Sequence, residues 1–317
     1  MKEPLQPQAP DGEAQLSYAW PEEMQSKLGK ALFQATHNAH LSPQFSDEKL
    51  AELLEAYPRE KLGIYRFPTY ENASGKAEHG CAPHLTGAEI LKAVQTGKIW
   101  LNLRAVNREV PEYKALADTI FEDLRTASGV STLKEDMGVL ISSPNIHVHY
   151  HLDIPLVCLV QLRGEKEIIV YPAGDPYVSS DEISDLVLNL KDEQMHYDAA
   201  FDSAATVVEM SPGVAVTWPQ TAPHRVQNGN SMNVSLSCEF MTPEAILKAN
   251  ALHTNAILRK KGWNVAAFPK KMSVVTLFKA GLARVLKKLI KTSVQSPVPI
   301  SFELQADGQI RPLLEAA

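Results

Sequence analysis

The chain has 317 residues, enough for one large domain or two smaller ones around an ample hydrophobic core. Its hydrophobic content of 44% and charged content of 21% are those of an ordinary globular protein and exclude a disordered or fibrous chain. The three cysteines show neither a CxxC nor a zinc-type spacing, which argues against a disulfide framework. The N-terminus has no apolar run and no stretch approaches 18 apolar residues, so we expect a cytoplasmic protein without a signal peptide or membrane span.

The net charge of −6 conceals two blocks of opposite sign. Eleven Lys/Arg and no Asp/Glu lie between Ala245 and Phe302, so the rest of the chain carries 20 basic and 37 acidic residues. One explanation is that the basic part packs on the acidic part, within a subunit or across a dimer. The alternatives are contact of the basic part with nucleic acid, an anionic membrane surface or an anionic substrate.

The N-terminal part of the chain is expected to be helical. Residues 1–15 are rich in Pro, Gln and Gly and predict a flexible arm, whereas residues 16–137 are expected to pack as a helical region on the domain that follows. One short strand is predicted over 99–103. The helix-start signals are a capping serine at Ser46, a capping box at Thr86 and Glu89, and a first-turn proline at Pro111.

Between residues 138 and 242 the hydrophobic period changes to that of strands. Eight short β-type runs, separated by Gly, Pro and Asn turns, predict a mainly β protein with helical flanks and a jelly-roll (double-stranded β-helix) core. A polar insert, about 172–205, lies between the fourth and fifth runs and contains one helix-like piece. Long excursions at the rim of a barrel are where substrate lids usually lie.

Residues 243–317 are expected to form a basic helical region. Its second helix carries an apolar stripe formed by Val275, Phe278, Leu282, Val285, Leu286 and Leu289. Lys279 flanks this stripe, and Arg284, Lys287, Lys288 and Lys291 lie on the far side of the helix. A stripe of this width usually packs against another helix, which favours a homodimer through the C-terminal helices. Binding to a membrane surface or to nucleic acid through this segment is a weaker alternative.

A row of acid and imidazole side chains opens the second β-type run. His147, His149, His151 and Asp153 are two residues apart, so a regular strand would place all four on one face. Such a row is costly in a dry core, and a metal ion or a wet pocket relieves that cost. His151 and Asp153 with the distant His224 would form the two-histidine, one-carboxylate face that binds non-haem Fe(II). The alternative is a satisfied polar cluster without metal.

Two segments, HLDIPLVCLVQLRGEKEIIVYP and MSPGVAVTWPQTAPHRVQN, resemble the JmjC and cupin-like Fe(II)- and 2-oxoglutarate-dependent oxygenases, in particular the asparaginyl-hydroxylase branch. HLDIPLVCLVQLRGEKEIIVYP has the family's His-x-Asp, then Gln161-x-x-Gly164-x-Lys166, then an apolar run ending in Pro. MSPGVAVTWPQTAPHRVQN is similar to the second signature, in which a Pro-Gly turn, an apolar strand and a Pro precede the distal histidine, here His224. The β-type region that contains both segments, residues 138–242, is about one third of the chain.

The resemblance implies an iron site and a co-substrate site. His151, Asp153 and His224 would hold Fe(II), and Lys166 would pair with the distal carboxylate of 2-oxoglutarate. A polar residue of the final strand, Asn233, Ser235 or Ser237, would add a contact with 2-oxoglutarate, and we take Ser235 as the candidate. The sequence departs from the family at Val148, where a Thr or Tyr that touches 2-oxoglutarate is frequent.

The expected activity is hydroxylation of an unactivated C–H bond of a small molecule or a side chain, or demethylation through hydroxylation. Two other functions stay open. The barrel could bind a ligand or partner without turnover, or the chain could be a JmjC-like regulator that uses its basic C-terminal segment.

Overall fold

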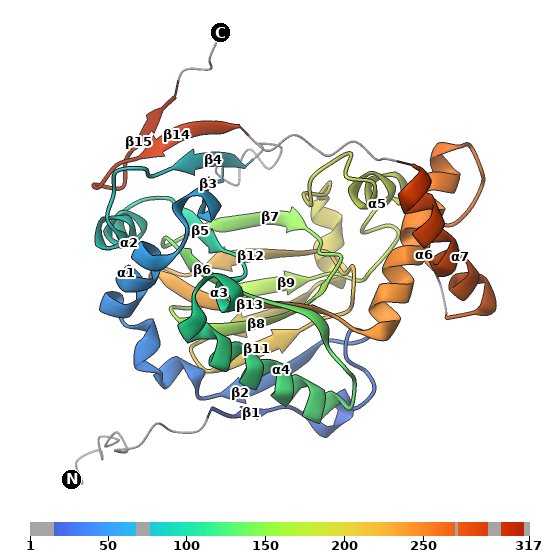
Figure 1. Cartoon of the computed structure of the whole chain (residues 1–317), viewed down its shortest axis with the longest axis horizontal. Coiled ribbons are helices and arrows are strands. Elements are labelled where there is room, and N and C mark those ends of the chain that lie inside the picture. Colours follow the sequence, from blue (N-terminus) through green and yellow to red (C-terminus); the bar gives the residue numbers. More distant parts are fainter. Residues whose placement is uncertain (1–15, 68–76, 270–271, 291–298, 314–317) are drawn as a thin grey trace.

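The structure is a computed structural model that describes residues 16–67, 77–269, 272–290 and 299–313. Two β-sheets lie at its centre, with helices α1 and α2 at one end and α5, α6 and α7 at the other (Figure 1). Within the described residues, no helix is both long and apolar enough to cross a lipid bilayer.

All eight predicted β-type runs are strands, and they form a jelly roll. The eight strands form two walls of four strands each. The strand order is β11-β8-β13-β6 in one wall and β10-β9-β12-β7 in the other, and neighbouring strands are antiparallel. This strand order confirms the predicted fold class. The strands are β6 (Leu133–Ser142), β7 (His147–His151), β8 (Leu156–Arg163), β9 (Lys166–Val170), β10 (Thr206–Met210), β11 (Val214–Thr217), β12 (His224–Asn228) and β13 (Asn233–Met241).

The first wall continues into an eleven-stranded sheet because strands from both ends of the chain join it. Of the N-terminal strands only β5 was expected from the sequence, and the C-terminal pair was not expected at all. These strands have two to five residues, too few to establish a period of two. They are β1 (Tyr18–Ala19), β2 (Phe33–His37), β3 (Gly63–Arg66), β4 (Glu78–Cys81), β5 (Trp100–Leu103), β14 (Ile300–Leu304) and β15 (Ile310–Pro312).

The N-terminal helices begin where their capping residues predict. Ser46 accepts a hydrogen bond from the amide of Lys49 at the start of α1 (Asp47–Ala56), and Thr86 and Glu89 form a complete capping box at α2 (Gly87–Thr96). A short helix, α3 (Val106–Glu109), and a 3-10 turn at Pro111 precede α4 (Lys114–Ser128). The apolar faces of these helices cover the outer side of the large sheet and form the main core.

The barrel interior is a separate apolar cluster between the two walls. It is formed by Val157, Leu159, Ile168, Val170, Val208, Met210, Val216, Trp218 and Ala222. Since alternate residues of a strand face opposite sides, the polar residues that share this register also point into the barrel.

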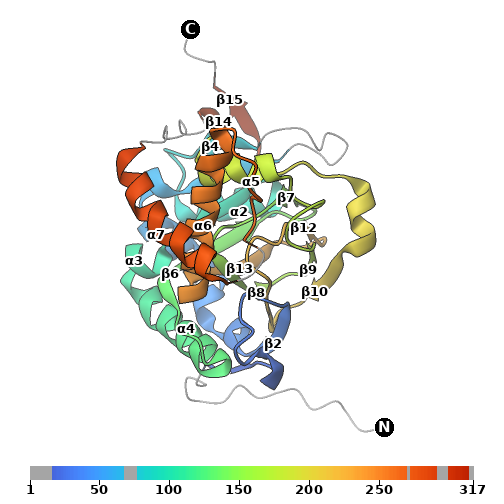
Figure 2. The same ribbon diagram turned by 90° about the vertical axis from the view of Figure 1, so that its right-hand side faces the viewer.

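The insert and the C-terminal helices lie together at the end of the barrel opposite to α1 and α2 (Figure 2). The insert contains α5 (Ser180–Val187) and packs with α6 (Pro243–Lys260). Helix α7 (Val274–Leu289) packs on α6 through the small residues Thr276, Ala280 and Ala283. Most of its predicted apolar stripe faces outward, with Phe278 70% exposed. Leu286 is the exception, because it packs against the cluster formed by Leu188, Ala256 and Ile257.

Candidate metal centre

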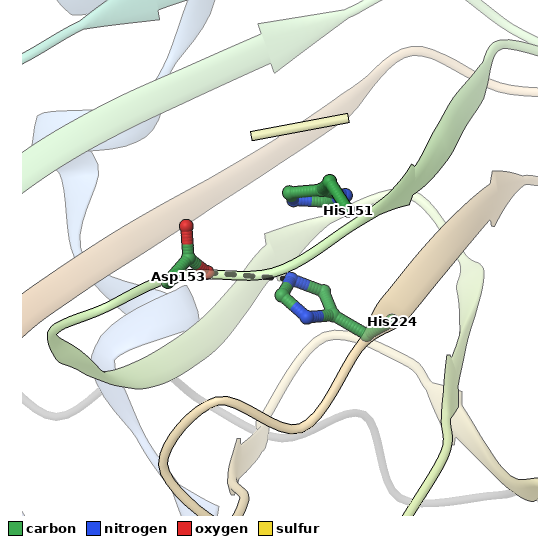
Figure 3. A group of neighbouring side chains, drawn as sticks. All are labelled: His151, Asp153 and His224. Carbon is green, nitrogen blue, oxygen red and sulfur yellow. Dashed lines mark ion pairs between the residues drawn. The ribbon is translucent and has the colours of Figure 1, made fainter. Parts of the chain in front are cut away.

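Three polar side chains meet inside one end of the barrel. His151 ends β7, Asp153 follows two residues later, and His224 begins β12 directly opposite His151 in the strand register. One ligand atom from each lies within 4.8 Å of the others, and Figure 3 shows the three side chains converging. Nε2 of His224 lies 3.4 Å from Oδ2 of Asp153, and the two imidazole centroids are 4.1 Å apart.

Backbone carbonyls orient both imidazoles. Nδ1 of His151 lies 2.7 Å from the carbonyl oxygen of His149, and Nδ1 of His224 lies 3.3 Å from that of Ala222. Because a carbonyl oxygen only accepts, each Nδ1 must donate its hydrogen in these contacts. The Nε2 atoms of the neutral rings are then left with free lone pairs, as metal-binding histidines require.

Burial raises the cost of leaving this cluster without a cation. His224 is 4% exposed, and burial followed by repulsion from His151 holds its pKa well below its ordinary value. Burial also raises the pKa of Asp153 to about 6, against a lowering by His151. A buried carboxylate beside two imidazoles whose Nδ1 atoms face backbone carbonyls fits a divalent cation bound through two nitrogens and one oxygen. The donor set thus suits Fe(II), and the expected ligand residues are brought together.

Lys166 lies deeper in the same barrel. Its position on β9 matches Ile168 and Val170, which face the interior, and Val170 is opposite His224. Lys166 is four residues from that level, or about 13 Å at roughly 3.3 Å per residue. Its side chain is 7% exposed, and no carboxylate of the described residues forms an ion pair with it. Burial lowers its pKa to about 7.

A buried polar network surrounds the ammonium group of Lys166. Nζ of Lys166 donates to Oγ of Ser235 at 2.5 Å, and Ser235 donates to Oε1 of Gln161 at 2.7 Å. The amide of Gln161 donates to Oδ1 of Asn233 at 2.7 Å. Of the three candidates left open on the final strand, Ser235 is therefore the one in contact with Lys166. An ammonium group without a counter-charge in this network is suited to an anion.

The four-residue polar row does not share one face, and this expectation is wrong. The register between β7 and β12 shifts, because three steps on β7 from His151 to Val148 match two steps on β12. Such an irregularity breaks the alternation of side chains. The ring of His149 packs 5.2 Å from Phe67, and His147 lies in a recess with Val148, Tyr197 and Arg225, among others.

Several other polar residues and two cysteines of the barrel and the insert lie outside the metal centre. Arg163 pairs with Asp47 on the surface at 2.6 Å, and Arg225 contacts the insert on the outer face of the small sheet. His196 is exposed, and Cys158 and Cys238 are buried in strands.

Sequence reasoning missed the residues that border the centre. The Trp218 ring lies 4.7 Å from that of His224, and Arg104 lies 4.0 Å from Glu239 near Asp153. Burial, with repulsion from Asp153, raises the pKa of Glu239 to about 7. Trp218 lies within the second signature and could have been flagged, whereas Arg104 and Glu239 carry no local signal.

Comparisons with known proteins give no match to a family model and none to a curated protein. Among solved structures, the Escherichia coli ribosomal oxygenase YcfD in complex with cobalt and 2-oxoglutarate is similar, with 16% identity and a TM-score of 0.48 over 85% of this chain and 67% of that chain. Another structure of E. coli YcfD has 17% identity and a TM-score of 0.47 over 81% of this chain and 64% of that one. The chain thus spans about two thirds of the length of these proteins. The fold assignment rests on the strand order.

Proposed function

We propose that this protein is an Fe(II)- and 2-oxoglutarate-dependent oxygenase that hydroxylates a C–H bond of its substrate. The observation that carries the proposal is the convergence of His151, Asp153 and His224 in a barrel that also buries an ammonium group without a counter-ion. When bound, Fe(II) and 2-oxoglutarate would supply oxidation by dioxygen, with succinate, carbon dioxide and a hydroxylated product formed.

The residues of the chain would bind Fe(II), orient 2-oxoglutarate and exclude water from the site. Nε2 of His151, a carboxylate oxygen of Asp153 and Nε2 of His224 would hold Fe(II) from one side, so that 2-oxoglutarate and dioxygen could reach it from the other. Lys166 would hold the distal carboxylate of 2-oxoglutarate, with Ser235 fixing the ammonium group. The apolar barrel interior, including Trp218, lowers the local dielectric constant and so strengthens that ion pair.

The test is formation of succinate from 2-oxoglutarate by purified protein with added Fe(II) and ascorbate. We expect turnover in the wild type and its loss in His151→Ala and Asp153→Ala, with the exposed His196→Ala as the control that retains turnover. Turnover that survives both ligand substitutions would contradict the proposal. Binding of 2-oxoglutarate without turnover in the wild type would instead support the ligand-binding alternative.

The substrate belongs to one of two classes, a small molecule or a macromolecular side chain. In the proposed organisation, residues 138–242 carry the catalytic core, while residues 16–137 and 243–317 border it and shape access to it. The demethylase and the regulator that uses the basic segment remain variants of this proposal, distinguished by the identity of the product.

We also propose a homodimer through α7. The residues Val275, Phe278, Leu282, Val285 and Leu289 recur at alternating steps of three and four, which is the spacing of a helix–helix seam. Their outward face is largely uncovered in the described chain, with Val275 61% and Leu289 75% exposed. A second copy of the same helix supplies a matching seam, and contact with a membrane or a nucleic acid is the alternative to be tested.

A further inference from the structure

The residues beside the two histidine ligands point away from the metal centre. Tyr150 precedes His151, and Arg225 follows His224. Tyr150 packs in the apolar cluster on the outer face of the small sheet, where its ring lies 4.9 Å from that of Tyr171. Arg225 donates from Nε to the hydroxyl of the same Tyr171 at 2.7 Å. The backs of both ligand-bearing strands therefore meet at one place on the outer face.

The insert covers that place through one aspartate. Asp202 accepts hydrogen bonds from the hydroxyl of Tyr171 at 2.6 Å and from that of Tyr197 at 2.8 Å. The guanidinium group of Arg225 pairs with Asp202 at 3.2 Å and lies 5.4 Å from the centre of the Tyr197 ring. Because Tyr197 and Asp202 belong to the insert, this network attaches the insert to β12 next to His224.

The insert also pairs with the backbone around the other histidine. Strand β7 is at the edge of the four-stranded sheet. The amide of Leu152 donates to the carbonyl of Glu193 at 3.2 Å, and the amide of Met195 donates to the carbonyl of Tyr150 at 2.9 Å. Gln194 is thereby bridged to His151. The backbone of His151 has β12 on one side and the insert on the other.

We infer that Arg225 and Asp202 are positioning residues that hold the insert against the small sheet and, through it, hold His151 in register with Asp153 and His224. The inference rests on the proposed metal centre, and it concerns two residues, Arg225 and Asp202, that are not among the three proposed metal ligands. The insert is then a fixed brace rather than the substrate lid expected from its length. Groups that orient metal ligands from outside typically change metal affinity by 10- to 100-fold when they are altered.

The experiment uses the full chain with Co(II) as the probe metal and two independent measurements. Co(II) affinity is followed by its visible absorption, and hydrogen–deuterium exchange follows the amides of Leu152 and Met195. Arg225→Lys keeps the charge but loses the fork of donors, and Asp202→Asn keeps the shape but loses the charge. The matched control is Arg163→Lys, an arginine at the end of another barrel strand that pairs with Asp47.

We expect both variants to lose exchange protection at Leu152 and Met195 and to bind Co(II) at least about 10-fold more weakly, with the control unchanged. Tyr197→Phe removes one hydroxyl and should lower the exchange protection and the Co(II) affinity by smaller amounts than the other two variants. It keeps the test informative if one of those variants fails to fold. Protection retained in both variants overturns the inference, as does lost protection with unchanged Co(II) affinity. If the wild type binds no Co(II), the oxygenase proposal fails; exchange in Arg225→Lys then decides whether the brace exists.

Discussion

Nζ of Lys166 on β9 lies 2.5 Å from Oγ of Ser235 on β13, across the barrel interior. The two residues are 69 positions apart in the chain, and their pairing places a buried cation in contact with a neutral hydroxyl. An ammonium group in this setting lowers the stability of the free protein and creates a strong site for an anion.

Replacement of Lys166 should separate co-substrate binding from folding. Lys166→Met removes the charge and should weaken 2-oxoglutarate binding by about 2–5 kcal/mol, or roughly 30-fold or more, because the ligand carboxylate would be buried without a partner. Lys166→Arg keeps the charge and should retain more of the affinity. Titration calorimetry with Mn(II) in place of iron measures both. Equal affinity in Lys166→Met and the wild type would remove Lys166 from the site.

The same lysine predicts a dependence of stability on pH. Burial lowers its pKa from 10.5 to about 7, so between these values the unfolded chain binds more protons than the folded one. The penalty is complete below pH 7 and is relieved as the pH rises toward 10.5, so the free energy of unfolding should rise with pH in that window. The stability advantage of Lys166→Met over the wild type should shrink by about 1.4 kcal/mol per unit between pH 7 and pH 9. Urea unfolding at the two pH values tests this, and a constant difference would contradict it.

Gly164 should be intolerant of a side chain. Its φ of +71° lies in the left-handed region, and an added Cβ would meet the carbonyl oxygen of Met232 at 2.4 Å. Gly164→Ala should therefore lower the free energy of unfolding by about 2–4 kcal/mol. Gly129 is the matched control, because its φ is +65° with nothing within 4 Å of the added atom, and Gly129→Ala should cost only about 1 kcal/mol. Similar losses at both positions would show that the contact with Met232 is unimportant.

The outward face of α7 should control self-association. Phe278→Asp places a charge in the proposed seam and should convert a dimer into a monomer in sedimentation velocity. Leu41→Asp is the control, since Leu41 is also 70% exposed but lies far along the chain in another element. The dimer proposal would be contradicted by a wild type that is monomeric at tens of micromolar protein, or by one that binds anionic vesicles through Phe278.

Much of the barrel and its site was predictable from local patterns. Alternation of apolar residues identified the eight strands, and the two-residue step from His151 to Asp153 correctly predicted that these two donors lie together, although the same step failed for His149 and His151. The role of Lys166 was predicted only from the resemblance of Gln161-x-x-Gly164-x-Lys166 to the oxygenase family, and the structure places this lysine inside the same barrel.

Tertiary structure decided what depends on pairing between distant segments. The register shift in β7 that separates His149 from His151, the contact of Ser235 with Lys166, and the pairing of Gln194 with His151 each involve a partner that the local sequence does not specify. The same holds for the face of α7 that turns outward, because the amphipathic pattern defines a stripe but not what covers it. Local periodicity reflects the geometry of a single element, whereas register and contacts minimise the free energy of the whole chain.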